Sequence, residues 1–458
     1  MKFSKLTIQN SEELLFGTAP HPVRTRRGLV IGGGRVYPEL NFTLPPMEVS
    51  KRTLPELKGQ YGEIVRGALT RAVELQSSGL VLEFETLLEM TLDPDIGVEL
   101  VKVMNEICDE FHRKSGLKSE IRLTPNDTRD FSQPPLMRTS PYLDRMLELF
   151  ERGADAGGDL LSIESTGGKE VHDEALLNGD IRQCLFALTV LGVRDMRFLW
   201  QKIVDIARRK NRIAGGDTAC GFGNTAMVLA EKRYIPRVFA AVVRAITAVR
   251  TLVAVEMGAT GPDKDCGYEG PFLKAITGIP ISMEGKTAAC AHFSPVGNVS
   301  EACCDLWSNE SVQNVKLLGG MAPIVSLEQL EYDVRLLNAA IADGPVTVRK
   351  LQQLLVESDI HLDPQALILG PESVLAISAE IVGAKNDIEA GKRAGLKALE
   401  IIGAAHREGR LKLDDREAGW VARLNDELGA VPTDESKLVE EVLPQLDRTK
   451  FVPGEYGL

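Results

Sequence analysis

Helical and strand patterns of apolar residues alternate along the chain between about residues 60 and 320. Apolar residues at helical spacing are followed, four times in succession, by short apolar runs typical of buried strands. The predicted helix and strand pairs are 61–76 with 79–85, 96–114 with 120–124, 142–152 with 159–164, and 180–209 with 212–216. This order is typical of a parallel sheet with crossover helices. Because no glycine-rich dinucleotide motif follows the first of these strands, the pattern favours a closed (β/α) barrel over a doubly wound nucleotide fold.

The two ends of the chain differ from this central region. Residues 1–60 are irregular and rich in proline, which predicts an extended N-terminal arm. The triplet Gly32-Gly33-Gly34 lies in this arm, and no capped helix follows it, so a phosphate-binding loop is disfavoured. Beyond about residue 320 helical patterns dominate. We therefore predict an α/β protein with a (β/α)8 TIM-type barrel over 61–390 and a C-terminal helical layer over 391–458.

The stretch that follows Pro236 is the most apolar part of the sequence. Five apolar residues fall on one helical face, namely Val238, Val242, Ala245, Ile246 and Val249. Arg237 and Arg244 lie off that face, which predicts an outer-ring helix with one side in water. Arg244, Arg250 and Glu256 also interrupt the run, so it contains no window of about 18 uncharged apolar residues and is not expected to span a membrane.

Composition indicates which kinds of partner and which cellular compartment to expect for this protein. The 458 residues carry a formal net charge of −12, which argues against a nucleic-acid partner, because phosphate neutralisation requires clustered Lys and Arg. Seven cysteines, an odd number in a long chain, do not resemble a disulfide framework. The first ten residues lack the pattern of a signal peptide. We therefore expect a cytoplasmic protein.

Three metal-capable side chains follow predicted strands in glycine-containing loops. Glu164 ends the third predicted strand, Cys220 follows the fourth, and Cys266 lies on the next long loop. In a (β/α) barrel these loops converge at the carboxyl ends of the strands. One carboxylate and two thiolates can bind zinc and leave a fourth position open. The spacing matches no short metal motif, however, and a buried structural role for each cysteine stays open.

Other side chains near these loops allow further interpretations. Glu83 and Glu85 share a strand face and could form an acid/base pair or be polar residues of the barrel interior. Three residues neighbour the expected ligands and are interpreted as orienting them: Lys169, Asp217 and Asp265.

The remaining cysteines and histidines are weaker candidates. Cys290 and His292 would share a face if they lay in a strand, but two ligands alone do not make a site. Cys303 and Cys304 are expected to pack in a helix. The other histidines are expected at the solvated surface: His21, His112, His172, His361 and His406.

Three segments of the sequence resemble the zinc-containing subunit of methanol:corrinoid methyltransferases. They are Leu161–Glu174, Gly216–Cys220 with Asn224–Met227, and Gly261–Cys266 with Tyr268–Pro271. The likeness extends through nearly the whole chain. In that family one glutamate and two cysteines hold zinc on a (β/α) barrel. The resemblance assigns these roles to Glu164, Cys220 and Cys266.

The resemblance also implies a reaction and partners. Methanol would donate its methyl group to the Co(I) of a corrinoid (cobalamin) carried by a separate corrinoid-binding protein, with zinc polarising the methanol oxygen. A homodimer within a larger complex is implied as well. The sequence leaves the proton donor open between Asp217, Glu85 and a water ordered by zinc.

Three alternatives remain open from the sequence. The methyl donor could be a methoxylated aromatic or a methylated thiol, because thiolate-bound zinc does not specify the substrate. The chain could be a non-catalytic scaffold for a corrinoid protein, in which case Glu164, Cys220 and Cys266 would be dispensable. A barrel hydrolase that uses Glu83 and Glu85 would need neither the cysteines nor a corrinoid.

Overall fold

Seven parallel strands form the centre of the protein. The computed structural model describes residues 3–44, 47–309, 311 and 316–458. Within these residues the sheet has the order β7-β6-β5-β4-β3-β9-β8, and every neighbouring pair is parallel. The strands are β3 (Tyr37–Asn41), β4 (Leu80–Glu85), β5 (Ser119–Thr124), β6 (Leu160–Ile163), β7 (Ile213–Asp217), β8 (Ser282–Glu284) and β9 (Leu306–Asn309).

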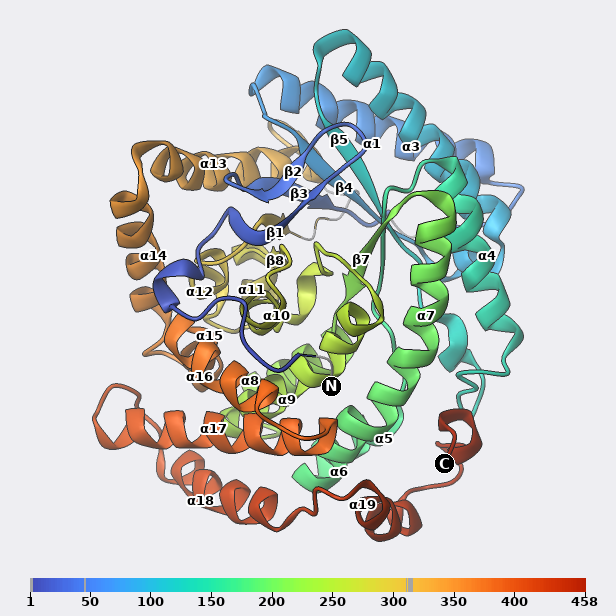
Figure 1. Ribbon diagram of the computed structural model, residues 1–458. Coiled ribbons are helices and arrows are strands. Elements are labelled where there is room, and N and C mark those ends of the chain that lie inside the picture. The colour runs from blue at the N-terminus through green and yellow to red at the C-terminus, as the bar shows by residue number, and fades with distance from the viewer. Residues whose placement is uncertain (1–2, 45–46, 310, 312–315) are drawn as a thin grey trace.

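The segment 260–263 occupies the gap between the two end strands of this sheet. The backbone N–H groups of Thr260 and Gly261 donate to carbonyls of β7 at 2.8 and 2.9 Å. On the other side, the N–H of Ser282 in β8 donates to Oδ1 of Asp263 at 2.9 Å. The segment thus takes the position of an eighth strand, and the curled sheet closes into a TIM-type α/β barrel as predicted (Figure 1).

Most ends of the outer helices lie within a few residues of the predicted ones, although α1 begins at Leu54 and not at residue 61. The four that alternate with strands β4 to β7 are α1 (Leu54–Glu74), α3 (Pro94–Ser115), α4 (Pro141–Ala156) and α7 (Val193–Lys210). Each of the first three has a proline in its first turn, a position where the missing N–H costs no hydrogen bond. The predicted helix 180–209 is divided into α6 (Ile181–Phe186), a π-helical turn (Ala187–Gly192) and α7.

Strand β3 lies within the residues that the sequence assigns to the N-terminal arm. It pairs with β4 on one side and β9 on the other, so the barrel begins before residue 60. The apolar pattern is weak there because the buried Glu39 points into the barrel, where it pairs with the buried Arg122 of β5. Pro38 further weakens the strand signal. The interior charge pair therefore hides a barrel strand from the sequence pattern.

The rest of the N-terminal segment covers the end of the barrel at which the strands begin. β1 (Thr18–Arg24) and β2 (Val30–Gly33) form an antiparallel hairpin that contains the first two glycines of the triplet. In its turn, Arg27 pairs with Glu120 of β5 and with Asp159 just before β6. The hairpin thus packs against the amino ends of the strands.

The C-terminal third of the chain consists mainly of helices. They are α13 (Ala322–Asp343), α14 (Pro345–Asp359), α15 (Pro364–Leu369), α16 (Pro371–Val382), α17 (Asp387–Arg407), α18 (Asp415–Ala430) and α19 (Glu435–Val442). Helix α17 crosses residue 391, the predicted start of the C-terminal layer. The shorter elements are α2 (Leu88–Leu92), α5 (Lys169–Asn178), α8 (Thr225–Glu231), α10 (Gly270–Thr277), α11 (Lys286–Ala291), α12 (Gly297–Glu301), β10 (Lys316–Leu317) and β11 (Gly320–Met321).

Helix α9 (Arg237–Met257) is buried on nearly all sides, and the predicted wet side is wrong for Arg244, whereas the side chain of Arg237 in the first turn is 43% exposed. Both Arg244 and Arg250 are fully buried. The C-terminal helices α15 and α17 pack against α9 and cover the side that the sequence left to solvent (Figure 1). By length and hydropathy α9 could cross a membrane, but 94% of its apolar window is buried in the protein. Core packing therefore accounts for its composition.

Candidate metal centre

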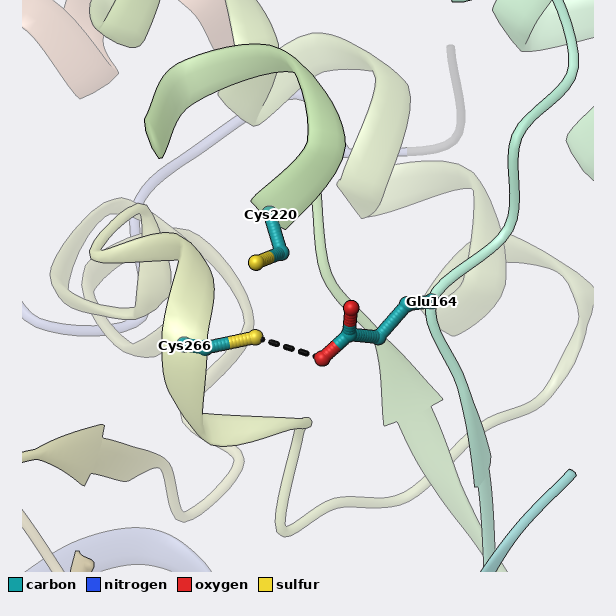
Figure 2. A group of neighbouring side chains, drawn as sticks. All are labelled: Glu164, Cys220 and Cys266. Carbon is teal, nitrogen blue, oxygen red and sulfur yellow. Dashed lines mark hydrogen bonds between the residues drawn. The ribbon is translucent and has the colours of Figure 1, made fainter. Parts of the chain in front are cut away.

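Glu164, Cys220 and Cys266 converge at the carboxyl ends of neighbouring barrel strands. Glu164 directly follows β6, Cys220 begins a π-helical turn after β7, and Cys266 lies in a 3₁₀ turn after the segment 260–263. Their ligand atoms all lie within 4.8 Å of one another. The Sγ of Cys266 donates to Oε1 of Glu164 at 2.7 Å, and all three side chains point into one space (Figure 2). The structure thus brings together the three residues that the sequence singles out.

Close backbone packing beneath the site makes this convergence possible. A Cβ atom on Gly216 of β7 would lie 2.8 Å from the Cα of Asp263. Only glycine allows β7 to approach the segment 260–263 this closely. The loops that carry Cys220 and Cys266 are consequently held side by side.

Burial controls the protonation of the two thiols. Cys266 is 3% exposed, and burial, followed by its contact with Cys220, raises its thiol pKa well above the usual range. For Cys220 the hydrogen bond with Cys266 lowers the pKa, while burial and the charge of Glu164 raise it, to about 12 in balance. Both thiols are therefore protonated in the metal-free protein, and a metal ion that binds them must displace two protons.

The buried amine of Lys264 links the acidic residues around the site. Its Nζ lies 3.1 Å from Oε1 of Glu164, 3.1 Å from Oε1 of Glu83 and 2.7 Å from Oδ1 of Asp265. It also lies 3.9 Å from the Sγ of Cys266. Its side chain is only 1% exposed. Lys264 therefore supplies positive charge inside an otherwise acidic cluster.

Glu83 and Glu85 lie in different environments although they share a strand face. Glu83 is fully buried and accepts a hydrogen bond from Thr124 in addition to its ion pair with Lys264. The side chain of Glu85 is 36% exposed and lies 4.0 Å from the Lys264 amine. Burial and then the charge of Glu164 raise the pKa of Glu85 to about 7.

Asp217 is a buried carboxylate that anchors the loops near the centre. It is fully buried and accepts hydrogen bonds from Ser165 Oγ and from Trp200 Nε1, both at 2.7 Å. It also accepts from its neighbour's N–H, that of Thr218, at 2.9 Å. The hydrogen bonds of the Asp217 carboxylate therefore hold the surrounding loops in place. Of the two carboxyl groups considered as proton donors, only Glu85 reaches solvent.

The other sequence candidates are not brought to the centre. Cys290 is exposed at the end of helix α11, so the strand considered for it and His292 is not formed. Cys303 and Cys304 are buried just after α12. In the part of the chain that the structure describes, Glu164, Cys220 and Cys266 are the one group of three or more metal-capable side chains this close together.

His172 contradicts the expectation of a surface histidine. It is fully buried on α5, and its ring packs edge-on against Phe222, with ring centroids 5.0 Å apart. Phe222 belongs to the turn that begins at Cys220. The polar neighbours of His172 in the sequence do not reveal this long-range contact.

Two further residues near the ligands were not singled out from the sequence. Asn224 Nδ2 lies 3.6 Å from the Sγ of Cys220 and donates to the carbonyl of Cys266. Glu269 Oε1 accepts from the backbone N–H of Ala219 at 2.6 Å. Both residues lie in the segments that carry the family resemblance, and each ties the Cys220 loop to the Cys266 loop.

Comparison with known proteins identifies the family. The sequence profile of the family described as methanol-cobalamin methyltransferase B subunit matches residues 1–457. The chain belongs to this family. It is 36% identical over 464 residues to the methanol–corrinoid protein co-methyltransferase of Methanosarcina barkeri (strain Fusaro / DSM 804), covering 100% of this chain and 99% of that protein. This membership confirms the resemblance found in the three ligand-bearing segments.

A solved structure of the family agrees with the fold. The methanol:cobalamin methyltransferase complex MtaBC from Methanosarcina barkeri contains a chain that matches this chain with a TM-score of 0.95 and 35% identity. The match covers 100% of this chain and 99% of the other. The barrel and its C-terminal helices are thus shared across the full length.

Proposed function

We propose that this chain transfers the methyl group of methanol to the Co(I) of a corrinoid held by a partner protein, using a zinc ion bound by Glu164, Cys220 and Cys266. The observation that carries the proposal is the convergence of one carboxylate and two sulfur atoms within 4.8 Å, in a member of the B subunit family. The relatives' names supply methanol and the corrinoid protein as substrate and partner.

The donor set fits zinc. One oxygen and two sulfur ligands match its preference, and three protein ligands leave a fourth tetrahedral position for a substrate. When bound, zinc would supply Lewis acidity toward the oxygen of methanol, which favours departure of that oxygen from the methyl carbon. A divalent ion that displaces two thiol protons leaves the net charge of the three ligands and the ion at −1, the value for Glu164 and two neutral thiols.

The protein's own residues would then hold the ligands and manage the proton. Lys264 keeps Glu164 in place through its ion pair and offsets the charges of Glu83 and Asp265. We propose that Glu85 donates the proton to the departing oxygen. Its side chain is 36% exposed at the carboxyl end of β4, and its pKa of about 7 leaves much of it protonated near neutrality.

The remaining assignments concern the assembly and the compartment. The corrinoid-binding partner would approach the barrel mouth, where the ligand loops lie. We further propose a homodimer within a larger complex, a cytoplasmic location, and no nucleic-acid or membrane partner. The net charge of −12 supports the absence of a nucleic-acid partner, and the free state of all seven cysteines supports the cytoplasmic location.

The test is an anaerobic assay of the purified, zinc-analysed protein with cob(I)alamin and methanol, with absorbance followed over time. Formation of methylcob(III)alamin that requires methanol supports the proposal. Zinc-loaded protein that methylates cobalamin only from a methoxylated aromatic or a methylated thiol would replace methanol as the donor. Full activity of the double variant Cys220→Ser, Cys266→Ser in the complete complex would favour the scaffold alternative.

A further inference from the structure

Helix α9 contacts the loops of all three proposed ligands through buried polar side chains. Arg250, fully buried, donates through Nη2 to the carbonyl of Ser165 at 2.5 Å and to its Oγ at 2.6 Å. Ser165 directly follows Glu164. The Nη1 of Arg250 lies 3.3 Å from Oδ1 of Asp217, and its guanidinium stacks on Phe222 at 4.5 Å from the ring centroid. Arg250 thus fixes the backbone next to Glu164.

Arg244 lies about 9 Å from Arg250 along the helix axis and contacts the other two loops. Its Nη1 donates to the carbonyl of Gly267, the residue after Cys266. Its Nη2 donates to the carbonyl of Gly223 at 3.1 Å and to Oδ1 of Asn224 at 3.3 Å, both in the turn that begins at Cys220. A single buried guanidinium therefore joins the two cysteine loops.

A third contact from α9 reinforces this arrangement. The hydroxyl of Thr251 donates to Oε1 of Glu269 at 2.7 Å, and the same oxygen accepts from the N–H of Ala219. Glu269 follows Cys266 by three residues, and Ala219 precedes Cys220. Helix α9 thus contacts the Cys266 loop at two residues, Gly267 and Glu269.

We infer that Arg244 and Arg250 are positioning residues of the metal centre, Arg244 for the two cysteines and Arg250 for the glutamate. This inference rests on the proposed function. Loops alone would leave the three ligands free to move apart, whereas a helix packed on nearly all sides provides a rigid support. Arginine suits the role because its planar fork can donate to two loops at once, which a lysine amine cannot do at the same spacing.

The inference predicts different defects for the two arginines. In Arg244→Met both cysteine loops lose their shared donor, so the thiolate ligands should be disturbed. In Arg250→Met the loop of Glu164 is released, so the carboxylate ligand should be disturbed while both thiolates stay bound. Residues that orient metal ligands typically contribute about 10- to 100-fold to metal affinity.

Cobalt(II) loaded in place of zinc reports these differences, because its visible bands depend on coordination geometry and its near-ultraviolet bands on thiolate binding. We expect Arg244→Met to lose thiolate-to-cobalt absorption. We expect Arg250→Met to keep that absorption but to show altered visible bands. Both variants should bind cobalt about 10- to 100-fold more weakly than the unmodified chain, with Arg244→Lys and Arg250→Lys intermediate.

Two matched controls separate positioning from general destabilisation. Arg237→Met changes an arginine on the same helix whose side chain is 43% exposed and pairs with Glu231. Arg27→Met removes a buried arginine that pairs with Glu120 and Asp159 at the opposite end of the barrel. Both controls should keep the cobalt spectrum and affinity of the unmodified chain, even where the unfolding temperature of Arg27→Met falls.

The outcomes distinguish this inference from the function on which it rests. Folded Arg244 and Arg250 variants with an unchanged cobalt spectrum and affinity would overturn the inference alone. If the methionine variants do not fold, lysine variants with an unchanged spectrum and affinity would do the same. Failure of the unmodified chain to bind either zinc or cobalt would overturn the proposed function and the inference with it.

Discussion

The amine of Lys264 lies 3.1 Å from Oε1 of Glu164, and the side chain of this lysine is 1% exposed. The same amine contacts the buried carboxylates of Glu83 and Asp265. A buried cation shared by several carboxylates stabilises the fold only while every partner is present, because each charge alone has lost its hydration.

Replacing Lys264 by methionine should therefore destabilise the protein strongly. We expect a loss of about 3–5 kcal/mol in the free energy of unfolding, because Glu83 and Asp265 stay buried without their counter-charge. Urea denaturation at pH 7 measures this loss. The matched control is Lys169→Met on α5, whose ion pair with the half-exposed Asp173 should contribute less than about 1 kcal/mol. Equal losses for the two variants would contradict the role assigned to Lys264.

Removing either thiol should abolish zinc binding. Cys220→Ala and Cys266→Ala each leave two protein ligands, too few for a stable zinc site, so we expect affinity to fall by more than about 100-fold and methyl transfer to be lost. Zinc content after dialysis against a chelator is the direct measurement. Cys290→Ala, which changes an exposed cysteine outside the centre, should retain full zinc. Stoichiometric zinc in either ligand variant would rule out the assigned ligand set.

Glu85→Gln should change the pH dependence of turnover. Burial and the charge of Glu164 raise the folded-state pKa of Glu85 to about 7, and a proton donor works only in its protonated form. The rate in the native chain should therefore fall about tenfold between pH 6 and pH 8. In Glu85→Gln this fall should vanish, and the rate at pH 6 should be at least about 100-fold lower. An unchanged pH profile in the variant would return the donor role to an ordered water.

The C-terminal segment supports the loop after Glu164. The hydroxyl of Tyr456, a residue that is 2% exposed, accepts a hydrogen bond from the N–H of Gly168 at 2.9 Å. Tyr456→Phe should lower the free energy of unfolding by about 1–3 kcal/mol, because the buried N–H loses its acceptor. Chemical denaturation tests this value.

The control for Tyr456 is Tyr332→Phe on α13. Tyr332 is 60% exposed, and its hydroxyl lies 3.4 Å from Oε1 of the nearby Glu328, so its replacement should have little effect. We also expect Tyr456→Phe to release zinc faster than the native chain, since the loop that it holds carries Glu164. Equal stability and equal zinc release in the two variants would count against this support.

Local patterns predicted the alternating elements and marked the three proposed ligands as candidates, to which the family resemblance assigned the metal. The strand at 80–85 and the helix at 94–115 follow from apolar spacing, which reports how a segment divides its own faces. Glu164, Cys220 and Cys266 were candidates because each lies in a glycine-containing loop after a strand, and such loops meet at one end of a barrel.

Contacts between distant segments account for what the sequence missed. Glu39 weakens the apolar pattern of β3. Its burial in a barrel strand is explained by its ion pair with Arg122 across the barrel, which the sequence does not show. Arg244 was predicted to face water because a helix pattern cannot show that α15 and α17 cover its polar side. The sequence could not show the hydrogen bonds of Asp217 either, because its donors Ser165 and Trp200 lie in other segments of the chain. Periodicity describes one segment at a time, whereas burial and hydrogen bonding depend on which other segments pack against it.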